Sequence, residues 1–254
     1  MHLSPNNPIC HRWRSVRPDD GRKETVPRCA LDERKLGLEL IQLFHDKGKN
    51  EALVQMTLGT LGAGQVAQAF AIHLLKAGHE VLLSNSRGPD SLKQLVSKLG
   101  KGARAVTMEE AARAPIVVLA VPWPQVEEVL AKLPEWEGRI LIDATNHFLL
   151  PSMELADLKG RVSSEIVSEL DPSARVVKAL NTLYASNLTL DPKVENGRRV
   201  IFVSGDDGDA KAEISGLLKG LGFAVIALGS LSEGGRAQQV GNGLAGVDLV
   251  QFGD

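Results

Sequence analysis

From Met56 onward, the apolar residues of the chain follow two alternating patterns. Short continuous runs predict strands at residues 56–61, 81–83, 103–106, 116–121, 140–142, 176–180, 199–204 and 224–228. Helical stripes predict helices at residues 66–75, 91–99, 109–113, 126–133 and 209–221. The run at 116–121 is apolar throughout and rich in β-branched residues, which is typical of a parallel strand buried on both faces. The alternation predicts an α/β fold, with a Rossmann-type, doubly wound, mostly parallel sheet and a small C-terminal α/β extension.

The pattern divides the chain into three parts. Residues 1–55 are predicted to be an N-terminal extension, disordered over 1–30 and with one helix near 32–47. That helix could pack on the body of the protein, pack on a partner subunit, or stay outside the fold. Residues 56–197 are predicted to form a Rossmann domain, and residues 198–254 a small C-terminal subdomain packed on it.

Composition narrows the class of protein. Hydrophobic residues make up 43% of the 254 residues and charged residues 24%, as in an ordinary globular enzyme. The net charge of -2 gives no reason to expect a nucleic-acid partner, and no apolar run approaches the roughly 18 residues of a membrane helix. Cys10 and Cys29 are the only cysteines, which excludes a disulfide framework and fits a reducing compartment. We therefore expect a cytoplasmic protein that binds neither nucleic acid nor membrane.

Residues 62–67 read Gly-Ala-Gly-Gln-Val-Ala, a G-x-G-x-x-A motif between a predicted strand and a predicted helix. Gly62 would allow the tight turn, Gly64 would let a pyrophosphate approach the backbone, and Ala67 would let the helix pack closely on the sheet. The free N–H groups at the start of the helix would then face the phosphates. The motif predicts a dinucleotide site; the alternative is a glycine-rich turn that binds nothing.

The segment after the second predicted strand bears on the choice of cofactor. A site for NAD(H) usually has an acid here to bind the ribose 2′-hydroxyl, but residues 84–89 read Ser-Asn-Ser-Arg-Gly-Pro and contain none. Ser86 could donate a hydrogen bond to a 2′-phosphate, and Arg87 could pair with its charge. The segment favours NADP(H) over NAD(H), although Arg87 could also be a solvated loop cation.

In doubly wound sheets, ligands bind beyond the carboxyl ends of the strands. That rule selects the residues that follow the later predicted strands: Val121, Pro122, Trp123, Thr145, Asn146, Asn181 and Thr182. Trp123 could stack on a ring or merely cap its strand. His147 could contact a substrate, but a loop histidine without a role is the simpler interpretation.

The remaining polar candidates are interpreted as structural. His73 and His79 lie in and just after the first predicted helix, away from the strand ends, and are expected to be structural or solvated. Asp143 could orient the loop that follows it or accept backbone hydrogen bonds. Asp206 and Asp207 are expected to form a solvated turn, since no third ligand for a metal ion is nearby.

Seven motifs together indicate a family; in chain order they are residues 61–64, 84–89, 120–123, 142–146, 177–182, 203–206 and 221–223. On these motifs, residues 56–252 resemble the coenzyme F420-dependent NADP oxidoreductases, a family that includes the reductase domains of the six-transmembrane metalloreductases. Met56 falls where family members typically begin, so residues 1–55 could reflect an upstream start codon instead of a functional segment.

The resemblance implies an NADP-dependent oxidoreductase that passes hydride to a small-molecule electron acceptor, with coenzyme F420 or a flavin as the second substrate. It also implies a homodimer. The cofactor-binding residues would be Gly62, Ala63, Gly64, Gln65, Val66, Ser84, Asn85, Ser86, Arg87, Ala120, Val121, Pro122, Asn146, Ala179 and Asn181. The second substrate would meet Trp123, His147 and Thr182. Leu180 departs from the family pattern, which usually has Phe before the Asn.

Direct hydride transfer between stacked rings needs proximity and orientation, and it does not require a protein acid or base. The sequence contains no nucleophile elbow, zinc helix or P-loop, so we expect neither a catalytic side chain nor a metal. An alternative is a non-catalytic protein that senses NADP(H). A weaker one, by analogy of fold alone, is an imine or keto-acid reductase.

Overall fold

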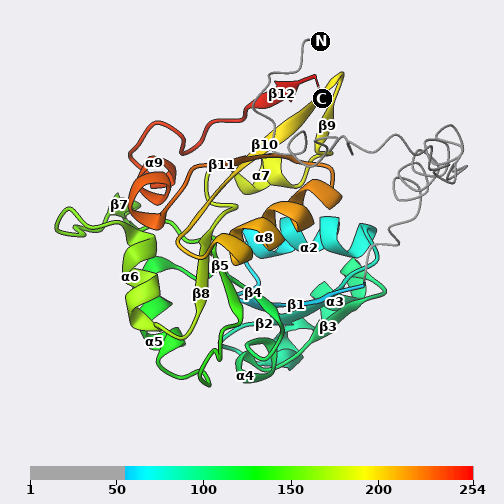
Figure 1. The fold of residues 1–254 in the computed structure, drawn as a ribbon. Coiled ribbons are helices and arrows are strands. Elements are labelled where there is room, and N and C mark those ends of the chain that lie inside the picture. The colour runs from blue at the N-terminus through cyan, green and yellow to red at the C-terminus, as the bar shows by residue number, and fades with distance from the viewer. Residues whose placement is uncertain (1–54, 254) are drawn as a thin grey trace, which may run out of the picture. The chain divides into compact units, whose positions relative to one another are not determined.

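A computed structural model describes residues 55–253 (Figure 1). The predicted disorder at 1–30, the predicted helix near 32–47 and both cysteines lie outside the described residues. Among the residues that are described, no helix is both long and apolar enough to cross a membrane.

One sheet runs through the described part of the chain, in the order β11-β10-β8-β5-β4-β1-β2-β3. Its strands are β1 Thr57–Leu61, β2 Glu80–Ser84, β3 Ala103–Ala105, β4 Ile116–Leu119, β5 Ile140–Asp143, β8 Arg175–Lys178, β10 Gly197–Gly205 and β11 Ala224–Ala227. From β3 to β8 all neighbours are parallel, and β10 pairs antiparallel with β8. The predicted Rossmann-type, mostly parallel α/β fold is confirmed.

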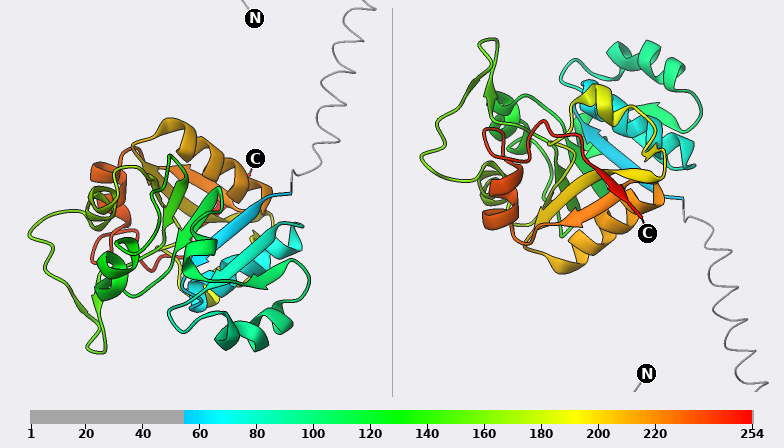
Figure 2. Two further views of the ribbon diagram at one scale, coloured as in Figure 1. Left: turned by 90° about the horizontal axis from the view of Figure 1, so that it is seen from below. Right: turned by 90° about the horizontal axis from the view of Figure 1, so that it is seen from above.

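Helices cover both faces of this sheet (Figure 2). One face packs against α2 Gln65–Lys76, α3 Lys93–Leu99, α7 Ala185–Leu188 and α8 Gly208–Gly220. The other packs against α4 Met108–Ala111, α5 Val126–Leu130, α6 Ser163–Leu170 and the π-helical turn η4 Leu231–Gly235. Strand β4 shows why both faces are apolar, because Ile116 and Val118 point to the first layer while Val117 and Leu119 point to the second.

Close packing of α4 on β1 depends on a glycine. A Cβ built on Gly59 would lie 2.0 Å from the carbonyl oxygen of Ala111. Any side chain at residue 59 would therefore push the two elements apart.

Several predicted bounds differ from the observed ones. The predicted helix at 91–99 begins as a 3₁₀ turn, η2 Pro89–Leu92, and the predicted helix at 126–133 ends at Leu130. The predicted strand at 176–180 ends at Lys178, because Leu180 has a φ of 66° and cannot continue an extended strand.

The chain after residue 197 extends the same sheet. Strands β10 and β11 form its edge, and two short strands, β9 Lys193–Val194 and β12 Val250–Phe252, pair with the start of β10. The division into a Rossmann domain and a C-terminal subdomain stays a prediction. A hairpin of β6 Phe148–Leu149 and β7 Glu154–Leu155 was not predicted, since two-residue strands carry no readable period.

Candidate functional site

The turn from β1 to α2 lies between the ends of two neighbouring strands. The Gly62 amide donates to Ser84 O at 3.1 Å, and the Ala120 amide donates to Leu61 O at 2.8 Å. Gly62 has a φ of 100°, and a Cβ there would lie 2.4 Å from Ala120 O. The fold itself therefore requires glycine at residue 62.

Gly64 is different, because nothing in the fold requires it. Its φ of -73° and ψ of -176° suit any residue, and a Cβ there would meet no atom within 4 Å. Gly64 is the N-cap of α2, and the helix start has neither a side-chain cap nor an acidic residue in its first turn. Its first N–H groups are thus available to an anion, and the bare backbone at Gly64 lets one approach. This arrangement fits the pyrophosphate of a dinucleotide.

This turn lies at the point where the strand order reverses, between β1 and β4, where doubly wound sheets bind their ligands. A cleft of about 560 Å³ opens there, and a smaller pocket of about 140 Å³ shares Gly64 and residues 120–122 with it. The predicted residues that line the larger cleft are Gly64, Gln65, Val66, Ala120, Val121, Pro122, Trp123, Thr145, Asn146, Asn181 and Thr182. Gly62, Ala63, Asn85 and Ser86 line the smaller pocket. The structure thus brings most of the predicted residues together.

The loop after β2 is ordered by its own side chains. Asn85 Oδ1 accepts from the Arg87 amide at 3.0 Å and from the Ser91 hydroxyl at 3.1 Å. Arg87 is exposed, and within the described part of the chain its guanidinium forms no ion pair. Asp90, the nearest acid on this loop, is paired with Lys93 at 2.7 Å. A bound phosphate beside Ser86 would therefore meet an uncommitted cation.

Four predicted site residues line neither the larger cleft nor the smaller pocket, and one of them is Arg87, which is exposed on the loop after β2. Ser84 is fully buried and its hydroxyl donates to Thr60 O, so its side chain lies inside the sheet. Ala179 is also fully buried and belongs to the core. His147 is buried behind the cleft wall. The side chains of the three buried residues thus face away from the cleft, because residues at strand ends alternate between facing a ligand and facing the core.

His147 packs edge-on against Trp123, with ring centroids 6.4 Å apart. Burial lowers the pKa of His147, and the charge of Lys178 lowers it further. Its Nδ1 is buried without a hydrogen-bond partner among the described residues. His147 is therefore a neutral ring that supports Trp123, which itself lines the cleft.

His73 and His79, the other two histidines among the described residues, have structural roles, as expected. His73 is buried, and its Nε2 lies 2.7 Å from Leu188 O. His79 is buried and its Nδ1 accepts from the Met56 amide at 3.2 Å.

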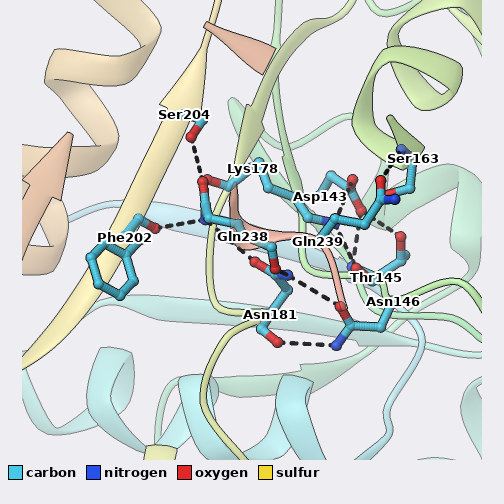
Figure 3. Close-up of polar contacts among 10 residues, drawn as sticks. All are labelled: Asp143, Thr145, Asn146, Ser163, Lys178, Asn181, Phe202, Ser204, Gln238 and Gln239. Carbon is cyan, nitrogen blue, oxygen red and sulfur yellow. Dashed lines mark hydrogen bonds and ion pairs between the residues drawn. The ribbon is translucent and has the colours of Figure 1, made fainter. Parts of the chain in front are cut away.

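The floor beneath the cleft is a buried ion pair (Figure 3). Lys178 Nζ donates to Asp143 Oδ2 at 3.0 Å and to Thr145 O at 2.6 Å, and neither charged side chain is exposed. Asp143 Oδ1 accepts from both the amide and the hydroxyl of Thr145, at 2.9 and 2.6 Å. Asp143 thus orients the loop that follows it, which is one of the two roles predicted for it from the sequence.

Above this floor, Asn146 and Asn181 bind each other reciprocally. Asn146 Nδ2 donates to Asn181 O at 3.0 Å, and Asn181 Nδ2 donates to Asn146 Oδ1 at 3.1 Å (Figure 3). Both line the cleft. The pair joins the loops after β5 and β8, so the two strand ends present one polar surface.

Part of the cleft wall was not predicted from the sequence. Phe148, Leu150 and Met153 come from the 148–155 hairpin, whose segment projects from the body of the fold (Figure 2). Tyr184, Val240 and Gly246 add the α7 loop and the C-terminal segment. None of these stands in a recognisable motif, so only the fold identifies them.

Asp207 also departs from its expected role as a solvated turn. It is the N-cap of α8, accepting from the Ala210 amide at 2.7 Å, and it forms two hydrogen bonds with Arg175. The Arg175 guanidinium and the Ala210 amide hold the pKa of Asp207 far below its ordinary value. Its role is structural, and no metal-binding cluster occurs among residues 55–253.

Comparison with known proteins agrees with this geometry. Residues 57–147 match the family model of the coenzyme F420-dependent NADP oxidoreductases. A solved structure of a putative F420-dependent NADP reductase from Arthrobacter is 29% identical, with a TM-score of 0.59 over 72% of this chain and 89% of that one. The matched residues carry the candidate dinucleotide site, and the chain resembles this family there. The similarity supports an NADP-dependent oxidoreductase with NADP(H) as its cofactor.

Two further relatives show how much of the chain has known counterparts. A hypothetical protein from Sinorhizobium meliloti is 37% identical, with a TM-score of 0.73 over 83% of this chain and 99% of that one. The rat metalloreductase STEAP3 is 29% identical over 185 residues, which is 72% of this chain and 36% of the relative. The chain thus spans about a third of the length of the curated relatives it matches.

Proposed function

We propose that this protein passes a hydride between NADPH and a deazaflavin or flavin-like acceptor. The observation that carries the proposal is the lining of the larger cleft, which includes both the start of α2 and an apolar wall from the 148–155 hairpin. A volume of about 560 Å³ is ordinary for a small-molecule site. The lining therefore supports a cleft in which the nicotinamide end of the cofactor and a second ring meet.

The cofactor end is assigned residue by residue. Gly64 and the N–H groups that open α2 would hold the pyrophosphate. Ser86 and Arg87 would hold the 2′-phosphate, for which a guanidinium is well suited. Asn146 and Asn181 would lie at the nicotinamide end. Ser84 and Ala179, which the family resemblance also suggests, are left out because their side chains are buried in the sheet and the core.

The residues that line the cleft support the proposed class of acceptor. Among the described residues that line it, none is Asp, Glu, Lys, Arg or His. Trp123, Phe148, Leu150 and Met153 instead offer aromatic and aliphatic surface. A surface of this kind suits a planar, largely apolar ring and gives a carboxylate or a bare metal ion no charged partner.

The chain contributes binding and orientation. When bound, NADPH supplies a hydride to the acceptor, which also takes up one proton from water and is reduced by two electrons. The polar floor fixes the loops at the strand ends, and the apolar wall excludes water from the facing rings. Proximity and orientation of this kind can supply most of the rate enhancement, so no side chain is assigned as an acid or a base.

A non-catalytic NADP(H) sensor is the second candidate, and Leu180 is the residue that would favour it by closing the cleft. However, Leu180 is buried in the core and does not line the cleft. The departure from the family pattern at this residue therefore leaves room for a second ligand, which supports the enzyme.

Two measurements test the proposal. Fluorescence titrations with NADPH and NADH establish binding and preference, and NADPH oxidation is then followed with coenzyme F420, FMN, a quinone and a ferric chelate as separate acceptors. We expect turnover with F420 or FMN, and Trp123→Ala should raise the KM for that acceptor while the Kd for NADPH stays unchanged. Reduction of the ferric chelate alone would refute the ring acceptor, and binding without any oxidation would favour the sensor.

A further inference from the structure

Gln238 is fully buried at the end of the short helix α9 Arg236–Gln238, and its amide has one possible orientation. Its Nε2 lies 3.1 Å from Phe202 O and 3.4 Å from Lys178 O. Carbonyl oxygens only accept, so the nitrogen must face them. The Oε1 on the other side accepts from the Ser204 hydroxyl.

Gln238 contacts the amide of Asn181 with both its backbone oxygen and its side chain (Figure 3). Asn181 Nδ2 lies 2.8 Å from the backbone oxygen of Gln238, and Asn181 Oδ1 lies 3.3 Å from Gln238 Nε2. The second N–H of Asn181 goes to Asn146 Oδ1 at 3.1 Å. Both N–H groups of Asn181 are thus used within the protein, and none remains for a ligand.

Asn146 is the end of this chain of amides. One N–H of its amide goes to Asn181 O at 3.0 Å, and its Oδ1 accepts from Asn181 Nδ2. One N–H and one lone pair of Asn146 therefore stay available, and Asn146 lines the cleft. Of the two asparagines, Asn146 is the one that can still bind the cofactor.

We propose that Gln238 is a positioning residue for the cofactor, because it fixes the amide of Asn181, which in turn holds the free N–H of Asn146 toward the nicotinamide end. The proposal rests on the proposed placement of the nicotinamide and does not depend on which acceptor is used. Gln238 lies 57 residues after Asn181 in the chain, so the C-terminal segment completes a surface that the strand ends begin.

The test compares two ligands on one variant of the whole chain. Gln238→Met keeps the length of the side chain and removes its amide, which frees Asn181 Oδ1. NADPH reaches the nicotinamide end, whereas 2′,5′-ADP has the adenosine and the 2′-phosphate but no nicotinamide. We expect the Kd of NADPH to rise about tenfold or more, equivalent to 1.4 kcal/mol, while the Kd of 2′,5′-ADP changes less than about twofold.

Gln239→Met is the matched control. Gln239 is the next residue and also makes a long-range bond, since its Oε1 accepts from the Ser163 amide at 2.8 Å, but it takes no part in the amide chain. Its substitution should leave both dissociation constants within about twofold of wild type. If Gln238→Met does not fold, Asn181→Ala tests the same step, because it releases Asn146 and should weaken NADPH alone.

Three outcomes would overturn the proposal. NADPH affinity unchanged in Gln238→Met and in Asn181→Ala would show that the amide chain does not reach the cofactor. Equal loss of NADPH and 2′,5′-ADP would show a general structural effect. Wild-type protein that binds 2′,5′-ADP as tightly as NADPH would place the nicotinamide elsewhere, and would overturn the proposed cofactor placement as well.

Discussion

The two glycines of the G-x-G-x-x-A motif should respond in opposite ways to the same substitution. Gly62→Ala forces a side chain into the left-handed region, at about 1–2 kcal/mol. It also places Cβ 2.4 Å from Ala120 O, and relieving such a contact costs about 1–3 kcal/mol. We therefore expect Gly62→Ala to lower the free energy of unfolding by about 2–5 kcal/mol.

Gly64→Ala should leave stability nearly unchanged. The backbone of Gly64 suits alanine and its Cβ would meet nothing. Alanine restricts the unfolded chain more than glycine does, which stabilises the protein by about 0.4–1 kcal/mol. Because alanine is also a weaker N-cap, the two effects roughly offset each other, and the free energy of unfolding should change by less than about 0.5 kcal/mol. The added methyl group occupies the approach to the helix start, and NADPH affinity should fall about tenfold or more.

Urea unfolding without nucleotide measures the first quantity for both variants, and fluorescence titration with NADPH measures the second. If Gly64→Ala unfolds at as low a urea concentration as Gly62→Ala, the fold does need glycine at residue 64. Gly64→Ala that binds NADPH like wild type would show that the phosphates do not pass here. Either result refutes the reasoning.

Three further predictions concern charge. Arg87→Ala should weaken NADPH about tenfold or more and NADH less than about twofold, and equal losses in parallel titrations would remove Arg87 from the 2′-phosphate site. Lys178→Met leaves Asp143 buried without its cation and should lower the free energy of unfolding, measured in urea, by about 3–5 kcal/mol. Adding Asp143→Asn to the same chain should restore part of this loss. A loss below about 1 kcal/mol would contradict a buried ion pair. Burial lowers the pKa of His73 and of His147 from 6.5, so the unfolded chain binds more protons just below that value. Stability should accordingly be full above pH 6.5 and decline as the pH falls below it, and the decline should be shallower in His147→Gln.

The nucleotide end of the candidate site could be predicted from the sequence because that end is local. Gly62, Gly64 and the start of α2 lie within one turn, and both the strand before it and the helix after it have clear periods. The second end depends on contacts that no local pattern carries. Gln238 lies in a glycine-rich stretch without a period, and only the pairing of β10 with β8 brings it beside Asn181.

Leu180 shows a different limit. The apolar run at 176–180 predicts a strand through Leu180, but that residue has a φ of 66° while its side chain is buried. A leucine in this region is strained, and the strain persists because packing and the bonds of Asn181 hold the turn. A hydrophobic pattern indicates which residues are buried, but it cannot indicate a turn of this kind.

The ion pair beneath the cleft was within reach of the sequence. Asp143 and Lys178 each end a strand directly after two buried apolar residues, and a charge at that place in a strand covered on both faces needs a partner. Strands β5 and β8 are parallel neighbours, and their register sets Asp143 directly beside Lys178. Once the order of the strands is predicted, an acidic and a basic residue that end neighbouring strands are expected to form an ion pair. Because Lys178 also binds Thr145 O, the same ion pair fixes the loop that presents Asn146, so a buried charge in the core and an amide that lines the cleft belong to one structural unit.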